Sequence, residues 1–168
     1  MGGHAKVEMA KLKATFETLG FRSVRTYINS GNVLFESNAK DRLGLTRKIE
    51  RGVERDAGFP IQTLVRTADE IEGLVDSIPR SWVNDRTMRC DVLFLWPDVD
   101  SPAVLAEIPI RRELEDLVYR PGALVWRVDR AKVGQSRVGR IIGSDLYRKL
   151  TIRNVNTVRK LNALLRAD

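Results

Sequence analysis

Residues 25–37, RTYINSGNVLFES, decide the fold of the first half of the chain. Apolar and polar residues alternate on both sides of a polar tip, Asn29-Ser30-Gly31-Asn32. A period of two predicts strands over 24–28 and 33–35. Glycine tolerates a positive φ, so Ser30-Gly31 is typical of a two-residue hairpin turn. The stretch predicts a β-hairpin whose tip is either a turn only or part of a site.

Helical and strand patterns surround this hairpin. Apolar residues at helical spacing predict a helix over 7–20. Asp41 is suited to cap a second helix that runs to residue 57, and residues 61–65 are typical of a strand. Thr67 and Glu70 match a capping box, which predicts a short helix to about residue 77.

The pattern restarts after the polar residues 80–89, which we expect to be a linker. We expect strands over 91–96, 117–120 and 124–128, helical segments near 102–106, 110–116 and from 137, and a last helix from about 154 to 165. The halves read α-β-β-α-β and β-α-β-β-α, so one added leading strand would give both the order of a ferredoxin-like sandwich. We predict an α+β protein with two tandem ferredoxin-like halves, 1–79 and 90–168, the first lacking its leading strand.

The formal net charge of the 168-residue chain, +7, is unevenly placed. Residues 127–168 contain eleven Lys and Arg against three Asp, a net +8, and the remainder has 18 basic and 19 acidic residues, a net −1. Such a cluster is typical of a nucleic-acid or phosphate binder. A solvated surface that keeps a protein in solution is the more common reason for such a cluster.

Several functional classes lack their sequence signals. Neither an apolar run of membrane length nor a signal peptide is present, so we expect a cytoplasmic protein without membrane contact. The one histidine, His4, and the missing phosphate-loop motifs lead us to expect no metal site and no cofactor. Cys90 lies in an apolar run and is expected to be a buried structural thiol.

The last predicted helix gathers polar residues on one face. At 100° per residue, that face holds Arg153, Asn156, Thr157 and Lys160, opposite an apolar stripe. Two interpretations stay open. Either Asn154 caps the helix and the other side chains are solvated, or the helix N-terminus, Arg153 and Lys160 bind one phosphate or carboxylate.

Two sequence blocks carry a family resemblance. Residues 2–37 contain Met-x-x-Leu and LGF-x-x-V-x-TYI-x-SGN, and residues 147–165 contain T-x-RN-x-NT-x-x-KL. With these motifs the chain closely resembles the bacterial domain of unknown function 1697 family over nearly its whole length. The resemblance implies tandem ferredoxin-like halves and no known activity. The matching residues are Gly2, Gly3, Met9, Leu12, Leu19, Gly20, Phe21, Val24, Thr26, Tyr27, Ile28, Ser30, Gly31, Asn32, Thr151, Arg153, Asn154, Asn156, Thr157, Lys160 and Leu161.

Two positions depart from the family pattern. Val155 stands where the family usually has tryptophan, which removes a stacking aromatic from the last helix. Met1 stands where the family has the valine of RGINVGG, so the leading strand would precede the sequence. We hypothesise a misassigned start, in which a GTG valine codon is read as initiator methionine; an immediate in-frame upstream stop would contradict this.

The resemblance implies that the hairpin tip lies beside the Gly2-Gly3 loop, with backbone amides that face an anion. We favour a polyanion-binding module, for nucleic acid or phosphate, although the aromatic RNP motif of RNA-binding sheets is missing. One alternative is an enzyme that acts on a small phosphorylated or carboxylated substrate, and another is a structural or protein-interaction domain. The predicted anion or ligand-binding residues are Gly2, Gly3, Ser30, Gly31, Asn32, Arg153, Asn156, Thr157 and Lys160.

Overall fold

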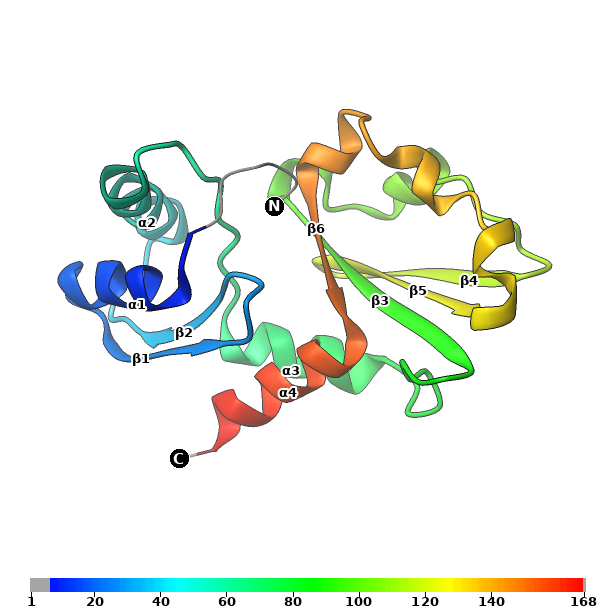
Figure 1. Ribbon diagram of the computed structural model, residues 1–168, viewed down its shortest axis with the longest axis horizontal. Helices are drawn as coiled ribbons and strands as arrows, with labels where there is room; N and C mark the ends of the chain where they lie inside the picture. Colours follow the sequence, from blue (N-terminus) through cyan, green and yellow to red (C-terminus); the bar gives the residue numbers. More distant parts are fainter. Residues whose placement is uncertain (1–6, 168) are drawn as a thin grey trace. The chain divides into compact units, whose positions relative to one another are not determined.

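The computed structural model describes residues 7–167, and the chain forms two compact units divided between Arg66 and Thr67 (Figure 1). The first unit contains α1 (Met9–Thr18), β1 (Arg22–Tyr27), β2 (Asn32–Glu36) and α2 (Arg42–Ala57). The second contains α3 (Ala68–Ser77), β3 (Met88–Leu95), β4 (Glu115–Arg120), β5 (Ala123–Asp129), β6 (Leu150–Asn154) and α4 (Val155–Arg166). Short 3-10 helices connect its strands: η1 (Pro97–Val99), η2 (Pro102–Glu107), η3 (Arg130–Gln135), η4 (Val138–Ile141) and η5 (Leu146–Lys149).

The predicted α+β class is confirmed. None of the helices described is long and apolar enough to cross a membrane.

The core of the first unit joins both helices to the antiparallel β1-β2 hairpin. Ile49 and Val53 of α2 are almost fully buried against an aromatic cluster. The ring centroid of Phe21 lies 4.7 Å from that of Phe35 and 5.7 Å from that of Phe16, and the centroids of Phe16 and Phe35 lie 5.2 Å apart. Burial of apolar area and aromatic contacts of this kind are the main stabilising terms of a small unit.

Helix α2 approaches the end of α1 closely at Gly52. A Cβ at this position would lie 2.8 Å from Leu19 Cδ1, closer than carbon atoms normally pack. A side chain at this position would have to displace the end of the Leu19 side chain, so the close approach favours glycine, although glycine in a helix costs about 0.5–1 kcal/mol relative to alanine. The ends of α2 follow the prediction, because Asp41 accepts a hydrogen bond from Leu43 N at 3.1 Å and Gly58 ends the helix at φ 82°.

The predicted strand over residues 61–65 is wrong, because no strand forms there. The amide of Thr63 donates to Glu50 Oε1 of α2 at 2.9 Å, so the segment is held by a helix side chain instead of a β-ladder. The capping box that follows is confirmed. The Thr67 side chain accepts from Glu70 N, and the Glu70 carboxylate accepts from Thr67 N, both at 3.1 Å.

The second unit is built on a four-stranded antiparallel sheet with the order β4-β5-β3-β6. One face packs its apolar residues, among them Leu93, Leu124 and Trp126, against the 3-10 segments through Val104 and Val138. Helix α4 packs against β3 and β6, and α3 packs against α4. In Figure 1 the two helices run together along one side of this sheet.

The second unit differs from the sequence-based expectations in several places. Residues 110–116 are not helical, because β4 starts at Glu115 and extends the predicted strand. The basic region from residue 137, which was expected to be helical, forms two short 3-10 helices. Residues 150–154 form β6, which the sequence pattern did not reveal, and the last helix starts one residue after the strand's Asn154. Contacts also group α3 with the second unit, whereas the sequence pattern placed residues 67–79 with the first half.

Candidate functional site

The tip of the β1-β2 hairpin is a four-residue loop over 28–31, not the two-residue turn that the sequence predicts. Tyr27 and Asn32 form the last paired position. Two loop residues take a positive φ, Gly31 at 78° and Ile28 at 49°. Glycine adopts this conformation freely, but a β-branched residue is strained in it, so the loop needs side-chain support.

Asn32 supplies that support. Its side chain is only 9% exposed, and its Nδ2 donates to Tyr27 O at 3.2 Å and to Ser30 Oγ at 2.9 Å. Both hydrogen bonds lie within the loop, so Ser30, Gly31 and Asn32 act together in holding the turn. Gly2 and Gly3 lie outside the described residues, and their approach to this tip stays a prediction.

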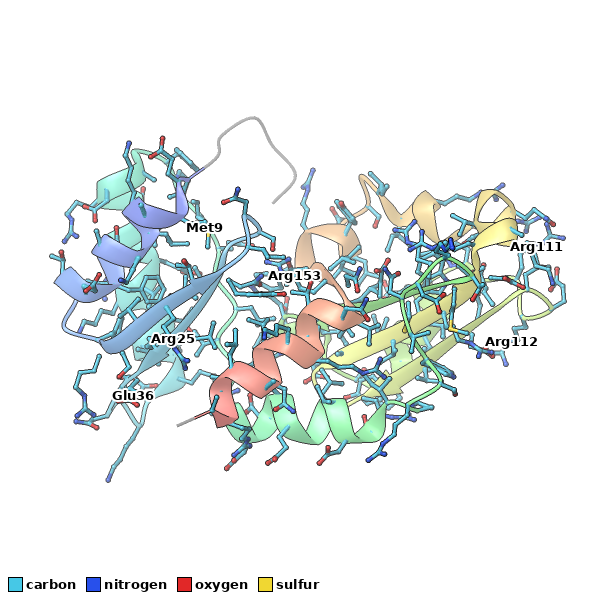
Figure 2. All side chains as sticks on the ribbon, turned by 60° about the horizontal axis from the view of Figure 1, so that its bottom comes forward. Met9, Arg25, Glu36, Arg111, Arg112 and Arg153 are labelled. Carbon is cyan, nitrogen blue, oxygen red and sulfur yellow. The ribbon has the colours of Figure 1, made fainter. Side chains whose placement is uncertain are left out.

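Arg153 does not lie on the polar face of the last helix as predicted, because it belongs to β6. Its Nη1 donates to Thr151 Oγ1 at 2.8 Å and to Ile152 O at 2.9 Å, and burial lowers the pKa of its guanidinium (Figure 2). Helix α4 begins at Val155, with Asn154 Oδ1 accepting from Asn156 N at 2.8 Å.

The face of α4 that remains carries Asn156, Thr157 and Lys160. Asn156 Nδ2 donates to Asn84 O at 2.8 Å, which ties α4 to the loop before β3. Lys160 is exposed, and no partner for it is present among the described residues. Lys160 is therefore available to a ligand, whereas the Asn156 amide nitrogen already bonds to the protein.

The basic C-terminal third is largely engaged in holding the fold. Arg159 donates to Trp82 O at 2.8 Å and to Pro79 O at 3.1 Å, and Arg130 Nη2 donates to Asn84 Oδ1 at 3.2 Å. These bonds order residues 79–85, most of the expected linker. Of the eleven basic residues from Arg127 onward, seven bond to protein groups: Arg127, Arg130, Arg148, Lys149, Arg153, Arg159 and Arg166. The four without a hydrogen-bond or ion-pair partner among the described residues are Lys132, Arg137, Arg140 and Lys160, of which Arg137 interacts electrostatically with Glu113.

Cys90 is fully buried in β3, as predicted. Burial raises the pKa of its thiol to about 11. The reactive form of cysteine is the thiolate, so Cys90 stays protonated and unreactive at neutral pH.

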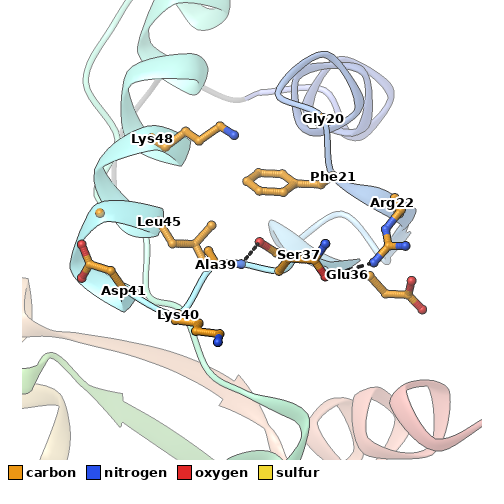
Figure 3. A pocket seen from close by; sticks show the side chains of 12 residues that line it. Gly20, Phe21, Arg22, Glu36, Ser37, Ala39, Lys40, Asp41, Leu45 and Lys48 are labelled. Carbon is orange, nitrogen blue, oxygen red and sulfur yellow. Dashed lines mark hydrogen bonds between the residues drawn. The ribbon is translucent and has the colours of Figure 1, made fainter.

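A pocket of about 460 Å³ lies in the first unit, between the end of α1, the end of β2 and the start of α2 (Figure 3). Phe21 and Leu45 form its apolar wall, and Arg22, Lys40 and Lys48 contribute three cations. Lys48 Nζ lies 5.0 Å from the centroid of the Phe21 ring. Such contacts stabilise an ammonium without neutralising it. No single sequence motif contains the three cations, so the pocket does not follow from the sequence pattern.

The three cations of this pocket have no ion-pair partner in the part of the chain that the structure describes. Arg22 Nη2 donates to the neutral amide oxygen of Asn38 at 3.3 Å. Glu36 and Asp41 also line the pocket, but the Asp41 carboxylate caps α2. The surrounding unit, residues 1–66, contains twelve Lys and Arg against seven Asp and Glu, a net +5, compared with 17 against 15, a net +2, in residues 67–168.

The model of the family described as Protein of unknown function (DUF1697) matches residues 1–126. The chain belongs to the DUF1697 family. One solved structure with a similar fold is that of the conserved bacterial protein SP0830 from Streptococcus pneumoniae, with 26% identity and a TM-score of 0.82. The superposition covers 99% of this chain and 93% of the other. Among curated proteins, none matches the chain.

The DUF1697 match includes the hairpin tip and the pocket of the first unit, and it ends before β6 and α4. The family is described by its unknown function, and the related structure is described only as that of a conserved bacterial protein.

Proposed function

We propose that the protein binds an anionic ligand through its first unit, and that a polyanion such as single-stranded nucleic acid is the class it fits best. The proposal rests on the pocket lined by Arg22, Lys40 and Lys48, three cations without an acidic partner among the described residues. Cations that are already paired gain little from an added anion, whereas unpaired ones attract it fully.

Further cations of the same unit favour an extended ligand over a small one. Arg47 and Arg51 are exposed on α2, and Arg51 Nε donates only to the backbone oxygen of Arg47, at 3.3 Å. A phosphate backbone can contact several such groups in turn and release one counterion for each. Asn156, Thr157 and Lys160 on α4 are a second proposed group of contacts, together with Ser30, Gly31 and Asn32 at the hairpin tip.

The test is a fluorescence anisotropy titration of the full chain with labelled oligo(dT) and oligo(U) between about 50 and 200 mM salt. We expect log Kobs to fall linearly with log salt, with a slope of about −0.7 for each phosphate contacted. Absence of binding to either oligonucleotide at the lowest salt would contradict the polyanion proposal.

The size of the pocket favours one other function, binding of a small phosphorylated or carboxylated substrate. About 460 Å³ lies within the range of small-molecule sites. Inorganic phosphate in the same assay separates the two functions. If phosphate and the oligonucleotide use the same pocket, phosphate at a concentration near its own Kd should reduce oligonucleotide binding. If the ligand is small, phosphate alone should raise the melting temperature of the protein.

We also propose that the chain consists of two ferredoxin-like halves, 1–79 and 90–168, joined by 80–89. The order β4-β5-β3-β6 supports this for the second half, since the first and third strands of a βαββαβ sandwich are central. In the same scheme α3 and α4 end the two halves, and they pack on each other. A cytoplasmic location would fit a ligand from the nucleic-acid or phosphate class.

A further inference from the structure

Glu115, the first residue of β4, carries a buried carboxylate on the side of the sheet that faces the 3-10 helices. It pairs with Val128 of β5, and its side chain is only 4% exposed. Ser136 Oγ, just after η3, donates to Glu115 Oε1 at 3.2 Å, which fixes the orientation of the carboxylate. Glu115 Oε2 is also buried and has no hydrogen-bond partner among the described residues.

Cations that could neutralise Glu115 are engaged elsewhere. Arg127 of the neighbouring strand lies on the opposite face of the sheet, where its Nη2 bonds to Asp116 Oδ2 at 2.6 Å. Arg89 pairs with Val128 across the sheet, but its Nε bonds to Asp91 Oδ2 at 3.0 Å, and the guanidinium lies over the Trp126 ring. A buried carboxylate oxygen without a donor lowers the stability of a fold, so its presence requires an explanation.

Glu115 lines a pocket of about 490 Å³ between η2 and β4. Leu105, Ile108 and Ile110 form an apolar wall of this pocket, and Arg112 lies at its surface. Arg112 has no partner in the described part of the chain, whereas the adjacent Arg111 pairs with Glu113 at 2.9 Å (Figure 2). The pocket therefore combines one unpaired acid, one unpaired base and an apolar surface.

We propose that this pocket binds a small zwitterion, such as an amino acid with an apolar side chain. Its cationic nitrogen would displace the groups that cover Glu115 Oε2 and donate to this buried oxygen, its carboxylate would pair with the Arg112 guanidinium, and its apolar part would contact Leu105 and Ile108. A guanidinium binds a carboxylate through two parallel hydrogen bonds, and few convergent polar groups on an apolar wall are typical of ligand sites. The negative charge of Glu115 makes this pocket unsuited to the anionic ligand of the first unit, so the inference is independent of that proposal.

The test is isothermal titration calorimetry of the full chain with L-leucine as the probe, beside two analogues. 3-Methylbutylamine lacks the carboxylate, and 4-methylpentanoate lacks the ammonium. We expect saturable binding of leucine, binding of the amine that is about tenfold weaker or more, and no detectable binding of the acid.

Three variants locate the binding. Glu115→Gln keeps the shape of the side chain and removes its charge, and should weaken leucine binding by about tenfold or more. Arg112→Gln should weaken leucine but leave the amine unchanged. Arg111→Gln, which removes an equal charge from the adjacent position, should change neither.

Several results would overturn the proposal. The first is a flat leucine titration with the wild-type chain, and the second is equal binding by wild type and Glu115→Gln. If Glu115→Gln raises the melting temperature while no probe binds the wild type, the carboxylate is only a destabilising buried acid. If Glu115→Gln fails to fold, the Arg112→Gln and Arg111→Gln comparison still decides the outcome, because both side chains extend toward solvent.

Discussion

Two sets of basic side chains, those of residues 127–166 and those around the pocket of the first unit, differ in what surrounds them. The first set is denser along the sequence, yet most of its members bond to carboxylates or backbone oxygens of the second unit. Arg22, Lys40 and Lys48 are spread over 27 positions, yet they line one pocket without an acidic partner among the described residues. A cluster of basic residues in the sequence therefore does not identify the cations that are available to a ligand.

The largest expected effect concerns the core that holds the pocket of the first unit. Gly52→Val would place side-chain atoms within the space of Leu19, and we expect the free energy of unfolding to fall by about 1–3 kcal/mol. Urea denaturation followed by circular dichroism measures this. Gly73→Val in α3 is the matched control, because a Cβ there meets no atom within 4 Å. A loss at Gly52 no larger than at Gly73 would show that contact with Leu19 is not responsible.

The next prediction separates structural from available cations within the C-terminal third. Arg159→Ala removes hydrogen bonds to Trp82 O and Pro79 O, and should lower the free energy of unfolding by about 1–2 kcal/mol. Lys160→Ala removes the same charge from the adjacent, exposed position and should change it by less than about 0.5 kcal/mol. Similar melting temperatures for the two variants would contradict the distinction.

The smallest expected effect is a dependence on acidic pH at the contact between α1 and α2. A hydrogen bond from Arg55, and a second from Thr15 Oγ1 at 2.6 Å, lower the pKa of Asp56 from 3.8 to about 2. A carboxyl group whose pKa is lowered by folding stabilises the fold above its unfolded pKa, and this contribution is lost as the pH falls from about 4 to 2. Melting temperatures of wild type and Asp56→Asn should therefore converge over this range. A constant difference between them down to pH 2 would exclude Asp56 as the cause.

Features that depend on a few neighbouring residues were predictable from the sequence. The capping box of Thr67 and Glu70 and the Asp41 cap use hydrogen bonds between residues two or three positions apart. β6 was missed because Ile152 is 37% exposed and the strand forms by pairing with the distant β3. Because β6 was missed, Arg153 was predicted to lie on the last helix, whereas it belongs to this strand.

The pocket of the first unit was not predictable, because its residues come from the segment after α1, the start of β1, the end of β2 with the loop that follows, and α2. No spacing links Arg22 to Lys48 in the sequence. The hairpin tip was predicted as a place of interest, but its side chains support the strained Ile28. The pocket becomes recognisable only when the fold brings these cations together.

The most direct test of the central claim compares two double variants that lose the same charge. Lys40→Gln/Lys48→Gln alters the pocket of the first unit, and Lys132→Gln/Arg140→Gln alters unpaired cations of the C-terminal third. Oligo(dT) binding to each is followed by anisotropy as a function of salt. We expect the first variant to reduce the salt slope by about 1.4, corresponding to two lost phosphate contacts, and the second to leave it unchanged. A larger loss in the second variant, or equal losses in both, would contradict the assignment of binding to the first unit.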